Sequence, residues 1–187
     1  MIFHEGDEAN AMHVLLAGHA TVRTTTPHGD SVIVTMLGPG SVFGELALLS
    51  DKALRTATVT AVEAVDTLTF LRRDLDELRQ TDPEMDRFLL DTLVNYVRRQ
   101  DARLIEALYV PVEKRVLRRL LALARLYGGP AVGTVVPLTQ EMLAGMAGST
   151  RPTTNQVLRA AEQAGLLRLA RGSIRICDPA GLVRRSR

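Results

Sequence analysis

The first half of the chain alternates apolar and polar residues in short runs that are separated by turn residues. The alternation recurs at residues 12–16, 20–23, 32–37, 56–62 and 66–71, with glycine-containing turns between most of the runs. Short strands at this regular spacing are typical of an antiparallel sheet that closes into a barrel or sandwich. The pattern therefore predicts a jelly-roll-like antiparallel β-barrel over residues 1–83.

From residue 84 the apolar residues recur at alternating steps of four and three. The positions on this seam are Leu90, Val94, Val97, Asp101, Leu104 and Leu108. A mean repeat of 3.5 residues places them on one stripe of a helix and is the signature of a coiled coil. Pro111 ends the pattern, because proline does not continue a helix. The sequence predicts a dimerisation helix over residues 84–110 that packs in parallel against a second copy of the chain.

The last part of the chain has three further helical patterns and a hairpin. An amphipathic helix is expected over residues 112–127, and a short helix follows Thr139, whose hydroxyl can cap its first N–H groups. After a tight turn, Thr150 caps another helix. The hairpin strands are expected near residues 166–169 and 174–176. This order predicts a winged helix-turn-helix over residues 111–187, so that the fold class of the whole chain is α+β.

Charge divides the chain more sharply than its net charge of +2 suggests. Residues 1–111 hold 10 Lys and Arg against 17 Asp and Glu, a net charge of −7, whereas residues 112–187 hold 13 against 4, a net charge of +9. A strongly basic segment favours a polyanionic partner such as nucleic acid. The two halves are therefore expected to have different functions.

The composition also excludes several classes of protein. The single cysteine, Cys177, rules out a disulfide framework and a four-cysteine iron–sulfur cluster within the chain. No apolar run is long enough for a membrane span, and a cytoplasmic protein is expected. The four histidines lack the spacing of a metal site, and no catalytic constellation is present. We therefore expect no enzymatic activity, no catalytic or metal-ligating residues and no bound cofactor.

A candidate anion site lies in residues 43–59, FGELALLSDKALRTATV. Gly44 permits a close backbone approach, and residues 46–49 are expected to form a helical turn with free N–H groups at its start. Arg55, ten residues after Glu45, can return across the loop and bind a phosphate through two hydrogen bonds. Glu45 has no role in binding an anion, but its carboxylate can accept a hydrogen bond from a hydroxyl such as that of a ribose.

The pattern Gly-Glu-Leu, followed by Arg-Thr-Ala at this spacing, is similar to the phosphate-binding cassette of cyclic-nucleotide-binding domains. With the helix-turn-helix and wing, the chain resembles the cyclic AMP receptor protein and FNR superfamily of transcription regulators from residue 2 to about residue 180. The segment at residues 2–7 resembles one that normally follows a leading helix and two strands. The resemblance thus implies that the chain begins inside its barrel domain.

The resemblance also implies a ligand. The implied contacts are Gly44, Glu45, Leu46, Arg55 and Thr56 in the cassette, with Gln100 and Asp101 of the dimer helix meeting the purine. The hydroxyl pair that better-known members carry at the purine is absent. Cyclic AMP is the expected effector, although Thr56 with a carboxylate would also suit the two adjacent donors of guanine in cyclic GMP. A register-setting role without ligand contact is the alternative for Asp101.

In the family the second helix of the helix-turn-helix lies in the DNA major groove. Arg151 matches an arginine that reads guanine, whereas Pro152 and Gln156 depart from the residues common in relatives and imply a different operator half-site. Thr153, Arg159 and Arg171 are expected to contact phosphates. The full set of expected DNA contacts is Thr139, Thr150, Arg151, Pro152, Thr153, Asn155, Gln156, Arg159 and Arg171.

The resemblance implies allosteric control of a homodimer on double-stranded operator DNA. Nucleotide binding would shift the long helix pair and a hinge at residues 109–111, and so set the spacing of the recognition helices. A loop similar to residues 128–136 contacts RNA polymerase in relatives, which makes the polymerase another candidate partner. The alternative is a regulator of the same fold that is independent of ligand or senses another signal, such as haem or redox state.

Overall fold

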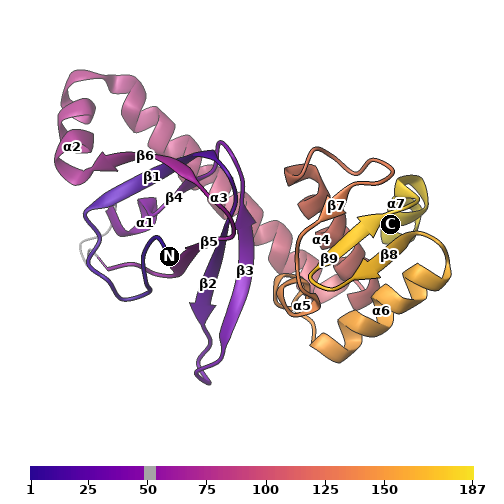
Figure 1. Ribbon diagram of the computed structural model, residues 1–187. Coiled ribbons are helices and arrows are strands. Elements are labelled where there is room, and N and C mark those ends of the chain that lie inside the picture. Colours follow the sequence, from indigo (N-terminus) through magenta and orange to yellow (C-terminus); the bar gives the residue numbers. More distant parts are fainter. Residues whose placement is uncertain (49–53) are drawn as a thin grey trace. The chain divides into compact units, whose positions relative to one another are not determined.

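The computed structural model describes residues 1–48 and 54–187, which form two compact units, residues 1–102 and 103–187 (Figure 1). The helix α3 (Pro83–Tyr109) contributes to both units. Its Leu89 packs in the core of the first unit, whereas its Glu106 bonds to the next helix in the second. The boundary between the two compact units thus falls within the long helix. The predicted domain boundaries after residues 83 and 110 stay predictions.

Two three-stranded antiparallel sheets form the N-terminal unit. In one sheet β1 (Ala11–Ala17) lies between β4 (Val42–Phe43) and β6 (Asp66–Leu71). In the other, β2 (Ala20–Thr25) lies between β3 (Ser31–Leu37) and β5 (Thr58–Ala61). Strands form over all five predicted runs, and β4 is an addition. The predicted strand at residues 56–62 is shorter than expected and leaves Thr56 outside β5.

Buried residues on both faces of β1, together with apolar residues of its neighbours, build the core of this unit. One buried cluster contains Leu15, Ala20, Phe43 and Val59, and the other contains Met12, Leu48, Leu75 and Leu89. The second cluster joins β1 to three helices: α1 (Glu45–Leu48), α2 (Arg72–Thr81) and the start of α3. The sequence did not predict α2, since Leu75 is its one buried residue among charged neighbours.

The C-terminal unit contains α4 (Val112–Leu126), α5 (Gln140–Ala147) and α6 (Arg151–Gln163). Thr139 accepts a hydrogen bond from the N–H of Met142 (3.2 Å), and Thr150 accepts one from the N–H of Thr153 (3.3 Å). Both predicted caps are therefore confirmed. The C-cap of α5 is Gly148, at φ +57°, a left-handed conformation that glycine adopts without steric strain.

A small sheet and one more helix complete this unit. The predicted hairpin is present as β8 (Leu167–Ala170) and β9 (Ser173–Ile176), and β7 (Val135–Val136) adds a third strand that the sequence did not predict. The helix α7 (Pro179–Ser186), also not predicted, is capped by Asp178 and buries Leu182 against the unit's core. Among the described residues, no helix is both long and apolar enough to cross a bilayer.

Candidate functional site

Arg55 lies buried in the N-terminal unit, and only 6% of its surface is exposed. Its backbone is held on both sides, because its N–H donates to the carbonyl of Asp7 and its carbonyl accepts from the N–H of Gly6, each at 2.9 Å. Its guanidinium lies 4.1 Å from the centre of the Phe3 ring and donates through Nη1 to the carbonyl of Gly44 at 3.3 Å. Segments far apart in the sequence therefore fix this one cation.

The Arg55 guanidinium is incompletely satisfied. Its buried Nε has no hydrogen-bond acceptor, and no carboxylate among the residues that the structure describes forms an ion pair with it. Burial lowers the pKa of Arg55, and the charge of Asp7 only partly opposes this. The group nevertheless stays charged at any physiological pH. A buried cation with free donors is suited to bind an anion.

Gly44 makes the approach of Arg55 possible. Its φ of +82° lies in the region that glycine favours, and a Cβ at this position would lie 2.5 Å from Nη1 of Arg55 and 3.3 Å from the carbonyl oxygen of Ala11. Any side chain here would displace the guanidinium. The close backbone approach predicted at Gly44 is therefore confirmed.

Replacing Gly44 by alanine should therefore impair anion binding as well as stability. The strained backbone alone is expected to cost about 1–2 kcal/mol. Gly40 is a matched control, because its φ is +83° and a Cβ there meets no atom within 4 Å. In chemical denaturation both Gly44→Ala and Gly40→Ala should lose stability, but only Gly44→Ala should lose ligand affinity in titration. Equal ligand affinities in the two variants would contradict the role given to the close approach.

Glu45 is the first residue of α1 and is 7% exposed. Burial raises the pKa of its carboxyl group, while a hydrogen bond from its own backbone N–H and the positive charge of Arg99 on α3 act in the opposite direction. Nothing in the sequence points to Arg99, because its spacing does not relate it to the cassette. A buried carboxylate beside a cation can accept a hydrogen bond from a ligand hydroxyl.

The structure brings only some of the predicted ligand residues together. Leu46 is half-buried next to Glu45, whereas Thr56 is exposed. Gln100 is half-buried and Asp101 exposed, and the side chain of neither forms a hydrogen bond within the part of the chain that the structure describes. The predicted turn extended to Leu49, which lies outside the described residues. The purine contacts therefore stay a prediction.

An aromatic cluster supports the buried arginine. His13 on β1 stacks on Phe43 and Phe3, with ring centroids 5.1 and 6.0 Å away, and its Nδ1 lies 3.1 Å from Oγ1 of Thr69. Burial, followed by the nearby charge of Arg55, lowers the pKa of His13 and favours the neutral ring. The spacing of the histidines does not distinguish His13, since its role depends on contacts between segments distant along the chain.

The predicted seam of α3 is exposed to solvent. The exposed fractions are 62% for Leu90, 46% for Val94, 54% for Val97, 59% for Leu104 and 67% for Leu108. Apolar side chains in such a continuous stripe rarely face water in a stable protein. This helix face is therefore suited to pack against another apolar helix.

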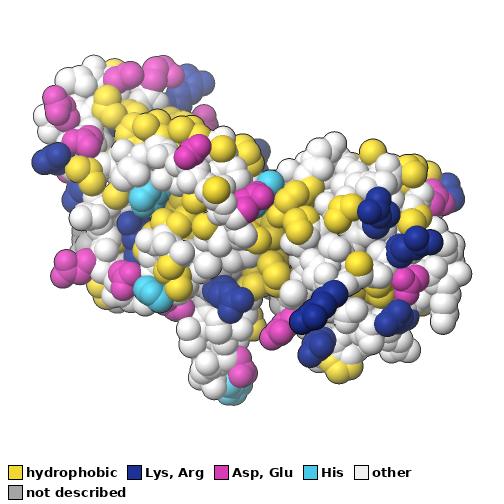
Figure 2. All heavy atoms as spheres, in the orientation of Figure 1, with side chains coloured by type: hydrophobic (Ala, Val, Ile, Leu, Met, Phe, Trp, Pro, Cys, Tyr) yellow, Lys and Arg dark blue, Asp and Glu magenta, His cyan; other side chains and the backbone are white. Residues whose placement is uncertain are grey.

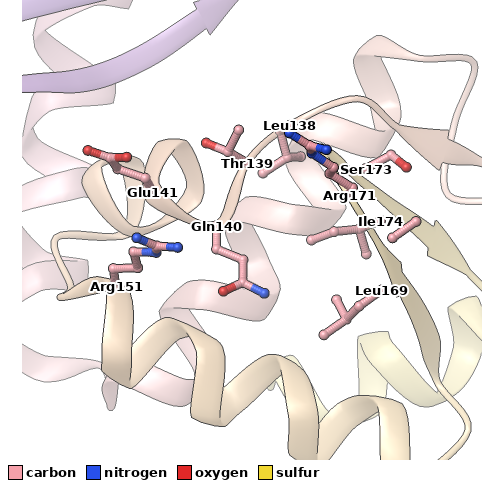
Figure 3. Close-up of a pocket in the computed structure, with 11 residues that line it drawn as sticks. Leu138, Thr139, Gln140, Glu141, Arg151, Leu169, Arg171, Ser173 and Ile174 are labelled. Atoms are coloured by element: carbon pink, nitrogen blue, oxygen red, sulfur yellow. The ribbon is translucent and has the colours of Figure 1, made fainter.

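Three of the predicted DNA contacts, Thr139, Arg151 and Arg171, line an open hollow of about 340 Å³ in the C-terminal unit. It is lined by the start of α5, by Arg151 in the first turn of α6, and by the turn between β8 and β9 with Arg171 (Figure 3). Arg151 and Arg171 reach its rim from different edges and are exposed, as are Thr139, Thr150, Pro152 and Gln156. Thr153 and Asn155 are half-buried.

Of the three predicted phosphate contacts, Arg159 alone has an acidic partner within the part of the chain that the structure describes. Its Nη1 donates to Oε2 of Glu162 at 2.9 Å, and Oε1 of Glu162 accepts from the N–H of Leu169 at 2.7 Å. These bonds lower the pKa of Glu162 and link α6 to the wing. Other basic side chains are spread over the visible face of this unit, whereas acidic ones concentrate on the N-terminal unit (Figure 2).

Comparisons with known proteins match both units. Residues 1–82 match the family model of the cyclic nucleotide-binding domain, and residues 114–185 match that of the Crp-like helix-turn-helix domain. The chain is 31% identical over 189 residues to the CRP-like cAMP-activated global transcriptional regulator of Mycobacterium tuberculosis, covering all of this chain and 84% of that protein. It is 30% identical over 179 residues to the cyclic AMP receptor protein of Thermus thermophilus, and the match covers 96% of this chain and 81% of that protein. A solved CRP-family regulator from Thermus thermophilus superposes with a TM-score of 0.81 at 26% identity, and the superposition covers 99% of this chain and 92% of that one.

Proposed function

The chain belongs to the CRP/FNR family of transcription regulators, and we propose that it is a homodimer whose binding to operator DNA is controlled by a cyclic nucleotide, cAMP in preference to cGMP. The family consists of regulators and not of enzymes. The preference for cAMP is supported by the relatives from Mycobacterium tuberculosis and Thermus thermophilus, whose names state that they respond to or bind cyclic AMP.

The observation that carries this proposal is the buried, incompletely satisfied guanidinium of Arg55. In the absence of an anion, a buried charge without a carboxylate partner is unfavourable, so the site gains most from a ligand that brings a negative charge. A cyclic phosphate carries a single negative charge and two free oxygens, which match two of the guanidinium donors. Glu45 would then accept the ribose hydroxyl, with Leu46 and Thr56 beside the ligand.

The exposed seam of α3 supports a parallel dimer. Two copies that pack along Leu90, Val94, Val97, Leu104 and Leu108 would bury the stripe in a coiled coil. Asp101 lies on the same seam and is its one charged member. Two facing carboxylates repel unless they find donors. An exocyclic amine of the purine would supply one, so Gln100 and Asp101 would couple ligand binding to packing of the dimer helix.

The exposed start of α6 supports insertion into the major groove. Arg151 would read a guanine, and Pro152, Asn155 and Gln156 would define the rest of the half-site. Thr139, Thr150, Thr153, Arg159 and Arg171 would contact phosphates at the edges of the groove. To contact a phosphate, Arg159 must first break its hydrogen bond with Glu162. A dimer presents two such helices, so the operator would be palindromic.

Calorimetric titration of cAMP and of cGMP into the purified chain tests the proposed effector. We expect one nucleotide to bind per chain, and cAMP to bind more tightly than cGMP. Tighter binding of cGMP would reverse the choice of nucleotide. If neither produced heat or raised the melting temperature, ligand control would be wrong and a ligand-independent DNA-binding protein would remain.

Arg151→Ala should weaken binding of the dimer to DNA selected from a random pool by about 2–6 kcal/mol, because one bidentate contact to guanine, worth about 1–3 kcal/mol, is lost in each half-site. This corresponds to roughly 30-fold to more than 10⁴-fold in affinity. Selection with the variant should lose the preference for one guanine in each half-site. Arg171→Ala is the matched control: it should weaken binding to all sequences alike and reduce the slope of log affinity against log salt by about 0.9 per phosphate contact. Unchanged sequence preference in Arg151→Ala would contradict the assignment.

A further inference from the structure

Arg115, in the first turns of α4, has an unusual set of partners. It is half-buried, and its guanidinium donates hydrogen bonds to backbone carbonyls through all three of its nitrogens. The acceptors are the carbonyls of Ala107 (Nη1, 2.8 Å), Val110 (Nη1, 3.4 Å), Ala147 (Nε, 3.1 Å) and Gly148 (Nη2, 3.0 Å).

These four carbonyls lie at the ends of two different helices. Ala107 and Val110 are at the C-terminus of α3, and Ala147 and Gly148 are at the C-terminus of α5. The last carbonyls of a helix lack intrahelical partners and form the negative end of its dipole. A single cation thus satisfies both ends and holds them together. Lysine cannot replace it in full, because its ammonium is a compact point charge, whereas the guanidinium presents donors in a fixed fork.

A second contact strengthens the attachment of α3 in the same unit. Glu106 of α3 is 14% exposed in its side chain and pairs with Arg119 of α4, while Nη1 of Arg118 lies 3.7 Å from its other carboxylate oxygen. Nε of Arg118 also donates to the carbonyl of Ser186 at the end of α7, at 2.8 Å. The last turns of α3 are therefore fixed to α4 on either side of the predicted hinge at residues 109–111.

We propose that Arg115 is a positioning residue that transmits the state of the long helix to the DNA-binding surface. Gly148 is three residues before Arg151, so the bonds from Arg115 reach the turn that leads into α6. The end of α3 and the turn of the helix-turn-helix then move as one body. The bonds of Arg115 bridge the hinge at Val110–Pro111, so that it does not rotate freely. This inference rests on the proposed function, because it concerns how nucleotide binding would alter DNA affinity.

The test is the ratio of DNA dissociation constants measured without and with saturating cAMP, which is the coupling factor. Coupling factors in proteins are typically about 5- to 150-fold. We expect Arg115→Gln to reduce this factor at least about fivefold and Arg115→Lys to reduce it less. Affinity for cAMP itself should change little. Arg125→Gln is the matched control, because Arg125 is an exposed arginine near the end of the same helix. If Arg115 were only structural, Arg115→Gln would lower the melting temperature and weaken DNA binding equally with and without cAMP. That result would overturn the proposal.

Hydrogen exchange of the whole chain without nucleotide gives a readout that does not depend on the proposed function. In Arg115→Gln, or in Arg115→Lys if the glutamine variant does not fold, amide exchange should rise together at residues 107–110 and 147–150. Unchanged exchange, or a rise in only one segment, would refute the link. If DNA binding by the wild-type chain did not respond to either cyclic nucleotide, the proposed function would fail, while hydrogen exchange would still decide the role of Arg115.

Discussion

Arg55→Met is expected to abolish measurable binding of cyclic nucleotide while leaving the free protein folded. Truncating one partner of a buried, charge-assisted hydrogen-bonded pair costs about 2–5 kcal/mol, which corresponds to roughly 30- to several-thousand-fold in affinity. Calorimetric titration of cAMP measures the loss directly. Arg73→Met is the matched control, because the side chain of Arg73 is 81% exposed and pairs only with its neighbour Asp74 among the described residues.

The same variant should have an opposite effect on the free protein. Arg55 is buried and has no anionic partner among residues 1–48 and 54–187, and methionine keeps the apolar stem that packs near Phe3 while removing this charge. The free energy of unfolding without nucleotide should therefore stay the same or rise. Addition of cAMP should raise the melting temperature of the wild type and of Arg73→Met but not that of Arg55→Met. Full retention of cAMP binding in Arg55→Met would refute the anion site.

Leu104→Asp is expected to convert the dimer into a monomer. Leu104 is 59% exposed in the single chain, and burial of one leucine contributes about 1.5–3 kcal/mol. Two copies per dimer would lose roughly 3–6 kcal/mol of association free energy, and hence about two to four orders of magnitude in affinity. The two aspartates would also face each other across the seam. Sedimentation at micromolar concentration should show the monomer, and operator affinity should fall because two half-sites are no longer bound together.

Leu16→Asp provides the comparison for this effect. Leu16 is 57% exposed in the N-terminal unit, so the chemical change and the exposure are nearly the same, but the residue is not on α3. It should leave both the oligomeric state and the affinity for operator unchanged. If Leu104→Asp remained dimeric, the seam of α3 would not be the dimer interface.

Local signals allowed much of the fold to be predicted from the sequence. Thr139 and Thr150 precede helices with free first-turn N–H groups, and both caps form as expected. The seam with a mean repeat of 3.5 residues, from Leu90 to Leu108, lies within α3, which ends shortly before Pro111 as expected. The cassette was recognised because Gly44, Glu45 and Arg55 have fixed spacing. These features depend on neighbours in the sequence, which is why they were accessible without coordinates.

The features that the sequence did not reveal depend on contacts between distant segments. The charge of Arg99 acts on Glu45 only because α3 packs in this unit, and His13 on β1 stacks on Phe3, whose ring lies against Arg55. The helix α2 was missed because it buries one leucine among charged residues. Nothing in the sequence distinguishes Arg115 from other basic residues of an amphipathic helix, since its partners are backbone carbonyls, which leave no trace in side-chain patterns.

The most direct test of the central claim is to measure the affinity of the purified chain for DNA selected from a random pool, without nucleotide and with saturating cAMP. The account predicts binding of one dimer to a palindromic site, with an affinity that cAMP raises by roughly 5- to 150-fold. By linkage, the same DNA should tighten cAMP binding by an equal factor. An affinity that is the same with and without cAMP would contradict it.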